Sequence, residues 1–130
     1  MKLLMLHTES FWYKPYNSDS SKTEKTIFQN CLVIFIHVEE ADKGRNDVID
    51  KAVGNIKWLA NKNKVTIVVL HSFAHLSTSK SDPDTASDII HKINEKLEKR
   101  LSTHTVPFGQ FYEFSVHVLS QSLAKVFKDL

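Results

Sequence analysis

Apolar and polar residues alternate along this chain in patterns that predict strands and amphipathic helices. Apolar runs and period-two alternation predict strands, whereas apolar residues three and four positions apart predict helices. The expected strands are Lys2–His7, an edge-like Phe11–Tyr16, Ile27–Val38, Val65–Leu70, a possible short Thr103–Val106, and Gln110–Val118. The expected helices are Asn46–Asn61, Pro83–Leu101 and a short closing helix, Gln121–Leu130.

The order of these elements predicts an α/β fold, in which helices pack on a mixed β-sheet. At 130 residues the chain is long enough for one domain with a single core, spanning residues 1–130. Neither GxGxxG nor GxxxxGK[ST] occurs, so the sequence does not indicate a nucleotide-phosphate loop.

The stretch from Val65 to Ser77 is the one around which the chain is organised. Its first half, Val65–Leu70, is apolar and rich in β-branched residues, which predicts the innermost strand of the sheet. Its second half, His71–Ser77, is a polar loop with two histidines. Loops at the end of a central strand are where α/β proteins usually place their functional sites.

Composition narrows the functional classes. The net charge of +2 is too small to indicate nucleic-acid binding by itself. No apolar run is long enough to cross a bilayer, and no signal-peptide pattern occurs. Cys31 is the one cysteine and cannot form an internal disulfide, so we expect an intracellular protein.

Several side-chain groups have both a structural and a functional interpretation. His71 and His75 have HxxxH spacing, but no ligand-rich neighbours, and no GxSxG motif marks a serine nucleophile. Glu39 and Glu40 could serve acid–base chemistry, although a solvated turn is the simpler interpretation. The aromatic side chains of Phe11, Trp12, Tyr13 and Tyr16 could either cover the sheet or stack on a nucleotide base. The cations Lys96, Lys99 and Arg100 could either match the dipole at a solvated helix end or contact a phosphate.

Four sequence blocks carry a resemblance to a known family. These are the opening KLLMLHTE, the strand ending IHVE, the segment SFAHLS at 72–77 and the turn Pro107-Phe108-Gly109. In this order they resemble the archaeal threonyl-tRNA synthetase editing domain, whose fold is related to D-aminoacyl-tRNA deacylases. The resemblance covers essentially the whole chain and implies a D-aminoacyl-tRNA deacylase-like α/β fold.

The resemblance implies proofreading hydrolysis of mischarged seryl-tRNA(Thr), which releases L-serine. Serine lacks one methyl group of threonine, a difference worth only about 1–3 kcal/mol in a binding pocket, so a second sieve is needed. In the family, the 2′-hydroxyl of the tRNA and main-chain groups are thought to position the attacking water. No cofactor and no metal are implied.

Residue roles also follow from the resemblance alone. His75 would contact the serine side chain, with Phe73 and Ala74 lining the same pocket. The other implied substrate-binding residues are His7 near the site, Val38 through its main chain, and Phe108 and Gly109 as a further wall.

Two positions depart from the family pattern. Tyr112 stands where the family commonly has a lysine after the PFG turn, and Lys125 stands where it commonly has a glutamate on the expected final helix. One hypothesis is that Lys125 replaces the missing charge, so that His75, Tyr112 and Lys125 form the catalytic set. The alternative is that Lys125 is solvated and activity is reduced.

The resemblance further implies the partners: the 3′ end of tRNA(Thr) carrying serine, the synthetase body in cis or in trans, and a second copy in a homodimer. A cytoplasmic location and no membrane partner are expected. Two other functions stay open, namely a D-aminoacyl-tRNA deacylase and a non-catalytic module for tRNA binding or synthetase dimerisation.

Overall fold

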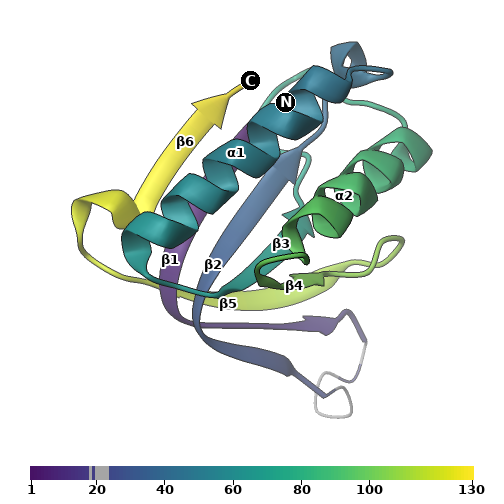
Figure 1. The fold of residues 1–130 in the computed structure, drawn as a ribbon. Coiled ribbons are helices and arrows are strands. Elements are labelled where there is room, and N and C mark those ends of the chain that lie inside the picture. Colours follow the sequence, from purple (N-terminus) through teal and green to yellow (C-terminus); the bar gives the residue numbers. More distant parts are fainter. Residues whose placement is uncertain (18, 20–23) are drawn as a thin grey trace.

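A computed structural model describes residues 1–17, 19 and 24–130 and places six strands in one mixed sheet (Figure 1). The sheet order is β4-β3-β2-β1-β5, with β6 also pairing with β1. The elements along the chain are β1 (Lys2–Pro15), β2 (Thr26–His37), η2 (Glu40–Asp42), α1 (Asn46–Asn63), β3 (Ile67–Ser72), α2 (Pro83–Leu97), β4 (Ser102–Thr105), β5 (Tyr112–Val118), η3 (Ser122–Ala124) and β6 (Lys125–Asp129).

β1 is one long strand rather than the two short ones expected from the sequence. The register of its pairing with β5 shifts between Thr8 and Ser10, and this irregularity explains why the apolar pattern breaks there. The edge-strand prediction for Phe11–Tyr16 is also wrong, because β1 pairs with β2 on one side and with β5 and β6 on the other. Pro15 is tolerated because it is the last residue of the strand.

β2, β3 and β4 are parallel, and their order corrects the expected position of β3. β3 is flanked by β2 and by the short edge strand β4, so β1 and β2 are the more central strands. The short strand expected at Thr103–Val106 is confirmed as β4. β3 is nevertheless buried on both faces, since Val68, Val69 and Leu70 are all inaccessible to solvent.

α1 and α2 both cover one face of the sheet, where most of the aliphatic core lies (Figure 1). Both expected helices are confirmed, although α2 ends at Leu97 rather than at Leu101. Asp82 caps α2 by accepting a hydrogen bond of 2.9 Å from the Thr85 backbone N–H. Neither helix of the described residues is long and apolar enough to span a membrane.

The closing helix expected at Gln121–Leu130 is wrong. The chain instead forms the single turn η3 and then β6, whose residues pair with the beginning of β1 from Leu6↔Lys125 to Lys2↔Asp129. Apolar residues at 123, 126, 127 and 130 fit helical spacing, but the free edge of β1 supplies backbone partners that an isolated ten-residue helix lacks.

The second face of the sheet carries a smaller, more aromatic core. The sheet curves, so that β5 and the C-terminal half of β1 lie on the side away from the helices (Figure 1). This core includes Phe11, Tyr13 and Phe35, packed with the half-buried Phe73 and Phe114. Part of the polar segment expected to be a loop at Asn17–Lys25 lies outside the described residues.

Candidate functional site

The carboxyl end of β3 places the SFAHLS segment over the aromatic face of the sheet. The Phe73 backbone N–H donates to the Ile36 carbonyl at 2.8 Å, so Phe73 continues the ladder between β3 and β2. The Phe73 ring contacts Phe35 with 4.9 Å between centroids, and the exposed His75 ring packs against Phe73 at the same separation. A chain of ring contacts therefore connects His75 to the buried core.

Tyr112 reaches the same aromatic face from β5. Its ring makes an edge contact with His71, with 5.9 Å between centroids, and another with Tyr13. Its hydroxyl donates to the Pro107 carbonyl at 2.7 Å, which ties the PFG turn to β5. Burial and the neighbouring Tyr13 hydroxyl raise the pKa of Tyr112, so its phenol keeps its proton and acts as a donor.

His71 is a buried imidazole within this aromatic group. Its ring contacts Phe35, Tyr112 and Phe114, and only 8% of the residue is exposed. Burial lowers the pKa of His71 to about 4, so the ring is neutral at pH 7. Its Nε2 atom is buried without a hydrogen-bond partner in the structure.

His37 positions the loop that follows His75. Its Nδ1 accepts the Leu76 backbone N–H at 2.9 Å, and its Nε2 lies 2.7 Å from the Ser79 carbonyl. Because Nδ1 accepts, the ring hydrogen must be on Nε2, which then donates to Ser79. His37 is fully buried, so these two bonds hold the loop in place from below.

Glu39 fixes the same loop from its other side. Its carboxylate accepts a 2.8 Å hydrogen bond from the Ser77 hydroxyl and also binds the N-terminal ammonium of Met1 at 2.9 Å. Burial acts to raise the pKa of Glu39, but hydrogen bonds from that ammonium, Ser77 and Lys2 outweigh it and hold the pKa at about 2. The solvated turn expected for Glu39 and Glu40 is therefore wrong for Glu39, although Glu40 is exposed; the nearby Asp42 is buried and also binds the ammonium.

The expected site residues fall into two separate groups. Phe73, Ala74 and His75 share one loop segment, and ring contacts through His71 bring Tyr112 beside it. The PFG turn lies next to Tyr112: Gly109 adopts a left-handed backbone with φ of 87°, and Phe108 lines a hollow of about 260 Å³ beside His104. Val38 is buried at the end of β2, where its carbonyl accepts the Ser81 N–H.

His7 and Lys125 form the other group, beside η3. The Nδ1 of His7 lies 2.6 Å from the Gln121 amide, and its Nε2 lies 3.0 Å from the Asn30 amide. Lys125 begins β6 and donates to the Leu119 carbonyl at 3.1 Å. Lys125 pairs with Leu6 of β1, whereas Tyr112 pairs with Pro15 at the other end of that strand, so one copy of the chain does not bring the ammonium to Tyr112.

Sequence analysis missed His37 and treated His71 only as half of an HxxxH pair. The signal for His37 was present, because strict alternation along β2 places it on the same face as Val33 and Phe35. Among the described residues, no group of three His, Cys, Asp or Glu side chains could hold a metal ion. The Ser77 hydroxyl donates to Glu39 and not to an imidazole, so no histidine activates it as a nucleophile. The site therefore suits binding and orientation of a reactive substrate.

The fold and the site loop define a class of protein: a small α/β domain whose mixed sheet carries a histidine-bearing loop after β3. The whole chain, residues 1–130, matches the family described as the archaea-specific editing domain of threonyl-tRNA synthetase. The chain belongs to this family.

Relatives of known annotation agree with this assignment. The chain is 31% identical over 139 residues to a threonine–tRNA ligase of Staphylothermus marinus, covering 100% of this chain and 22% of that protein. It is 27% identical over 131 residues to a threonine–tRNA ligase editing subunit of Saccharolobus solfataricus, covering 97% of this chain and 33% of that protein. The chain thus spans about a fifth to a third of the length of these relatives.

A solved structure supports the fold. The c-Myc DNA unwinding element binding protein superposes with a TM-score of 0.76 at 11% identity, covering 100% of this chain and 99% of that one. At this identity the likeness concerns the fold alone, and it confirms the D-aminoacyl-tRNA deacylase-like α/β class expected from the sequence.

Proposed function

We propose that this chain hydrolyses the ester of seryl-tRNA(Thr) and so removes serine attached in error. The observation that carries the proposal is membership of the editing-domain family over residues 1–130. The ester is already reactive, so the protein has to bind it, orient a water and exclude threonine. A site without a covalent nucleophile is sufficient for this, if the 2′-hydroxyl of the tRNA and main-chain groups position the water.

In this proposal the SFAHLS loop forms the amino-acid pocket. The exposed His75 ring would contact the serine hydroxyl, and Phe73 and Ala74 would leave no room for the methyl group of threonine. His37 and Glu39 act as positioning residues, because their bonds to Leu76, Ser77 and Ser79 fix the loop. Phe108 and Gly109 would close the pocket from the PFG turn, which Tyr112 fixes through Pro107.

The partners in this proposal are the 3′ end of tRNA(Thr) and the synthetase body, supplied in cis or in trans, and a second copy of the chain. In this proposal Lys125 and His7 of the same copy stay outside the chemistry, because both lie beside η3 and not in the SFAHLS loop. A Lys125→Ala variant that hydrolyses at the wild-type rate would remove the charge-replacement hypothesis.

The test compares deacylation of seryl-tRNA(Thr), threonyl-tRNA(Thr) and a D-aminoacyl-tRNA by the purified chain. We expect hydrolysis of the seryl ester only. A His75→Ala variant should lose roughly tenfold of this activity, the value of one hydrogen bond of about 1.4 kcal/mol. His117→Ala is the matched control, because His117 is also an exposed histidine but pairs with Glu9 on the outer side of β5.

Two other outcomes would replace the proposal. Hydrolysis of the D-ester instead would move the chain to chirality checking. Hydrolysis of none of the three esters, with or without the synthetase body, would leave a non-catalytic tRNA-binding or dimerisation module.

A further inference from the structure

Two grooves lie at opposite ends of the pair of helices on the sheet, and they differ in charge. The groove at the N-terminal ends has a volume of about 410 Å³ and carries three cations (Lys43, Arg45, Lys92) and three carboxylates (Asp82, Asp84, Asp88). The other groove, of about 540 Å³, is here called the basic groove. It is lined by Lys57, Ala60, Asn61, Lys64, Val65, Thr66, Arg100 and Leu101.

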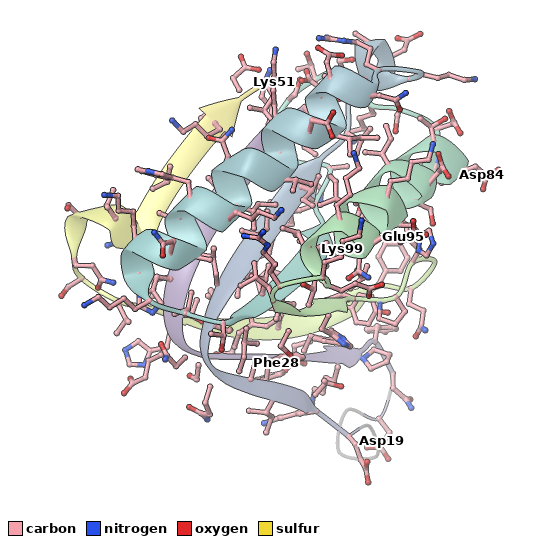
Figure 2. All side chains as sticks on the ribbon, viewed as in Figure 1. Asp19, Phe28, Lys51, Asp84, Glu95 and Lys99 are labelled. Atoms are coloured by element: carbon pink, nitrogen blue, oxygen red, sulfur yellow. The ribbon has the colours of Figure 1, made fainter. Side chains whose placement is uncertain are left out.

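The basic groove has a net positive charge because three cations and no carboxylate line it. Its cations are Lys57, Lys64 and Arg100, and within the described part of the chain none of these three side chains forms an ion pair or hydrogen bond. Three other cations on the helices, Lys51, Lys92 and Lys96, are paired with Asp47, Asp88 and Asp50. Lys99, labelled in Figure 2 at the end of α2, adds a further exposed cation next to Arg100 in the chain.

The helix dipole accounts for only part of this cluster, since Lys64 and Arg100 lie at helix C-termini whereas Lys57 does not. Cations are stabilised within about the last turn of a helix, but Lys57 lies well before the end of α1 at Asn63. Lys64 caps α1 in the left-handed region, with φ of 55°, a conformation that favours glycine. A lysine at such a position is retained at a conformational cost, which points to a use for its side chain.

We propose that the basic groove binds the phosphate backbone of the RNA substrate, away from the reacting ester. Lys57 and Lys64 are about 10 Å apart along α1, at 1.5 Å per residue, which suits two phosphates of one backbone better than one small anion. Val65 lines the groove two residues before β3, and Phe73 follows the end of that strand, so groove and site are separated by about 25 Å of chain. The inference rests on the proposed function for the identity of the RNA.

The experiment measures binding of a fluorescent acceptor-stem hairpin of tRNA(Thr) that carries no amino acid on its single-stranded 3′ end. Binding is followed by fluorescence anisotropy at several salt concentrations. The test variant is Lys57→Gln/Lys64→Gln/Arg100→Gln. The matched control is Lys43→Gln/Arg45→Gln/Lys92→Gln, which removes the same charge from the other groove. We expect the test variant to bind roughly tenfold or more weakly at 0.1 M salt, with a log–log salt slope shallower by about 2–3.

A single substitution separates binding from folding. Lys64→Gly removes one charge and also relieves the left-handed backbone, so its thermal midpoint should be no lower than that of the wild type while its RNA affinity falls severalfold. Unchanged affinity and salt slope in the triple variant would overturn the proposal. An equal loss in the control variant would also overturn it, since the effect would then reflect net charge.

Competition with inorganic phosphate identifies a small-anion site. If millimolar phosphate displaces the hairpin from the wild type at constant ionic strength, the groove binds single anions and the proposal fails. Because the hairpin carries no aminoacyl ester, these results do not depend on hydrolysis. A chain that binds it through the groove but cleaves no seryl ester would overturn the proposed function alone.

Discussion

The two faces of the sheet in this protein are built from the same strands but with different chemistry. On the helix-covered face, residues such as Leu32 and Ile34 of β2 contact the apolar stripes of α1 and α2. On the other face, Val33 and Phe35 of the same strand meet aromatic rings and the imidazole of His71. Alternation along a strand makes this division possible, since neighbouring side chains point to opposite faces.

The difference separates stability from function. The core of the aliphatic face consists of close-packed apolar side chains, and the one buried ammonium at its edge, that of Met1, is paired with Glu39 and Asp42. The aromatic face holds buried polar atoms, among them the unpartnered Nε2 of His71, and it supports the loop that carries His75. Polar atoms without partners are costly, which is the pattern expected where a fold accommodates a site.

The largest effect on stability should come from the aliphatic face. Ile34 is fully buried there, so Ile34→Ala should lower the free energy of unfolding by about 3 kcal/mol through lost burial and an unfilled cavity. Urea denaturation followed by circular dichroism would measure the loss. Ile27→Ala is the control, because Ile27 belongs to the same strand but is 56% exposed, and it should cost less than about 1 kcal/mol. Equal losses at the buried Ile34 and the exposed Ile27 would show that burial on the aliphatic face does not determine the loss of stability.

Acid should weaken the aromatic face first. The pKa of His71 is about 4 when folded against 6.5 in the unfolded chain, so the unfolded state binds more protons between these values. The contribution of neutral His71 to stability is therefore fully present above pH 6.5 and is lost as the pH drops to 4, by about 3 kcal/mol. His71→Phe should flatten this part of the stability curve and be neutral or stabilising at pH 7. A curve that keeps its slope in the variant would show that His71 does not titrate there.

Much of the fold was predictable from the sequence because local pattern and tertiary context agree. The amphipathic stripes of α1 and α2, the apolar β2 and the Asp82–Pro83 helix start all depend on neighbouring residues. The closing segment was wrong because its spacing fits both a helix and a strand, and only the free edge of β1 decides between them. The joining of two predicted strands into β1 likewise depends on partners distant in sequence.

The site was predictable in part for the same reason. Phe73, Ala74 and His75 are contiguous, so a sequence block identifies them, and Tyr112 follows from its place after the PFG block, with alternation along β5 giving its face. The remote position of Lys125 depends on β6 pairing with β1, which local pattern does not contain. The role of Glu39 depends on an ammonium at the far end of a long-range contact, with no sequence signal nearby.

Glu39 joins the N-terminus of the chain to the site loop, and it should titrate below His71. Its pKa of about 2 lies under its usual 4.5, so its contribution is present above pH 4.5 and is lost as the pH falls toward 2. Glu39→Gln should lower stability at pH 7 by about 2 kcal/mol, because the Met1 ammonium keeps Asp42 as its partner. Comparing His71→Phe with the double variant His71→Phe/Glu39→Gln separates the two pH windows. A Glu39→Gln curve parallel to its parent below pH 4.5 would refute this assignment.

The smallest effect should come from a polar contact inside the aromatic face. The Tyr13 hydroxyl lies 2.6 Å from His104 Nε2, and the two rings stack at 5.8 Å. Tyr13→Phe keeps the ring and removes only this hydrogen bond. Because His104 lines a hollow that water can enter, the imidazole can find a new partner, and the loss should be about 1 kcal/mol. Burial lowers the pKa of His104, which favours the neutral ring in this contact. A loss as large as that of Ile34→Ala would mean that polar contacts, and not packing alone, hold the aromatic face together.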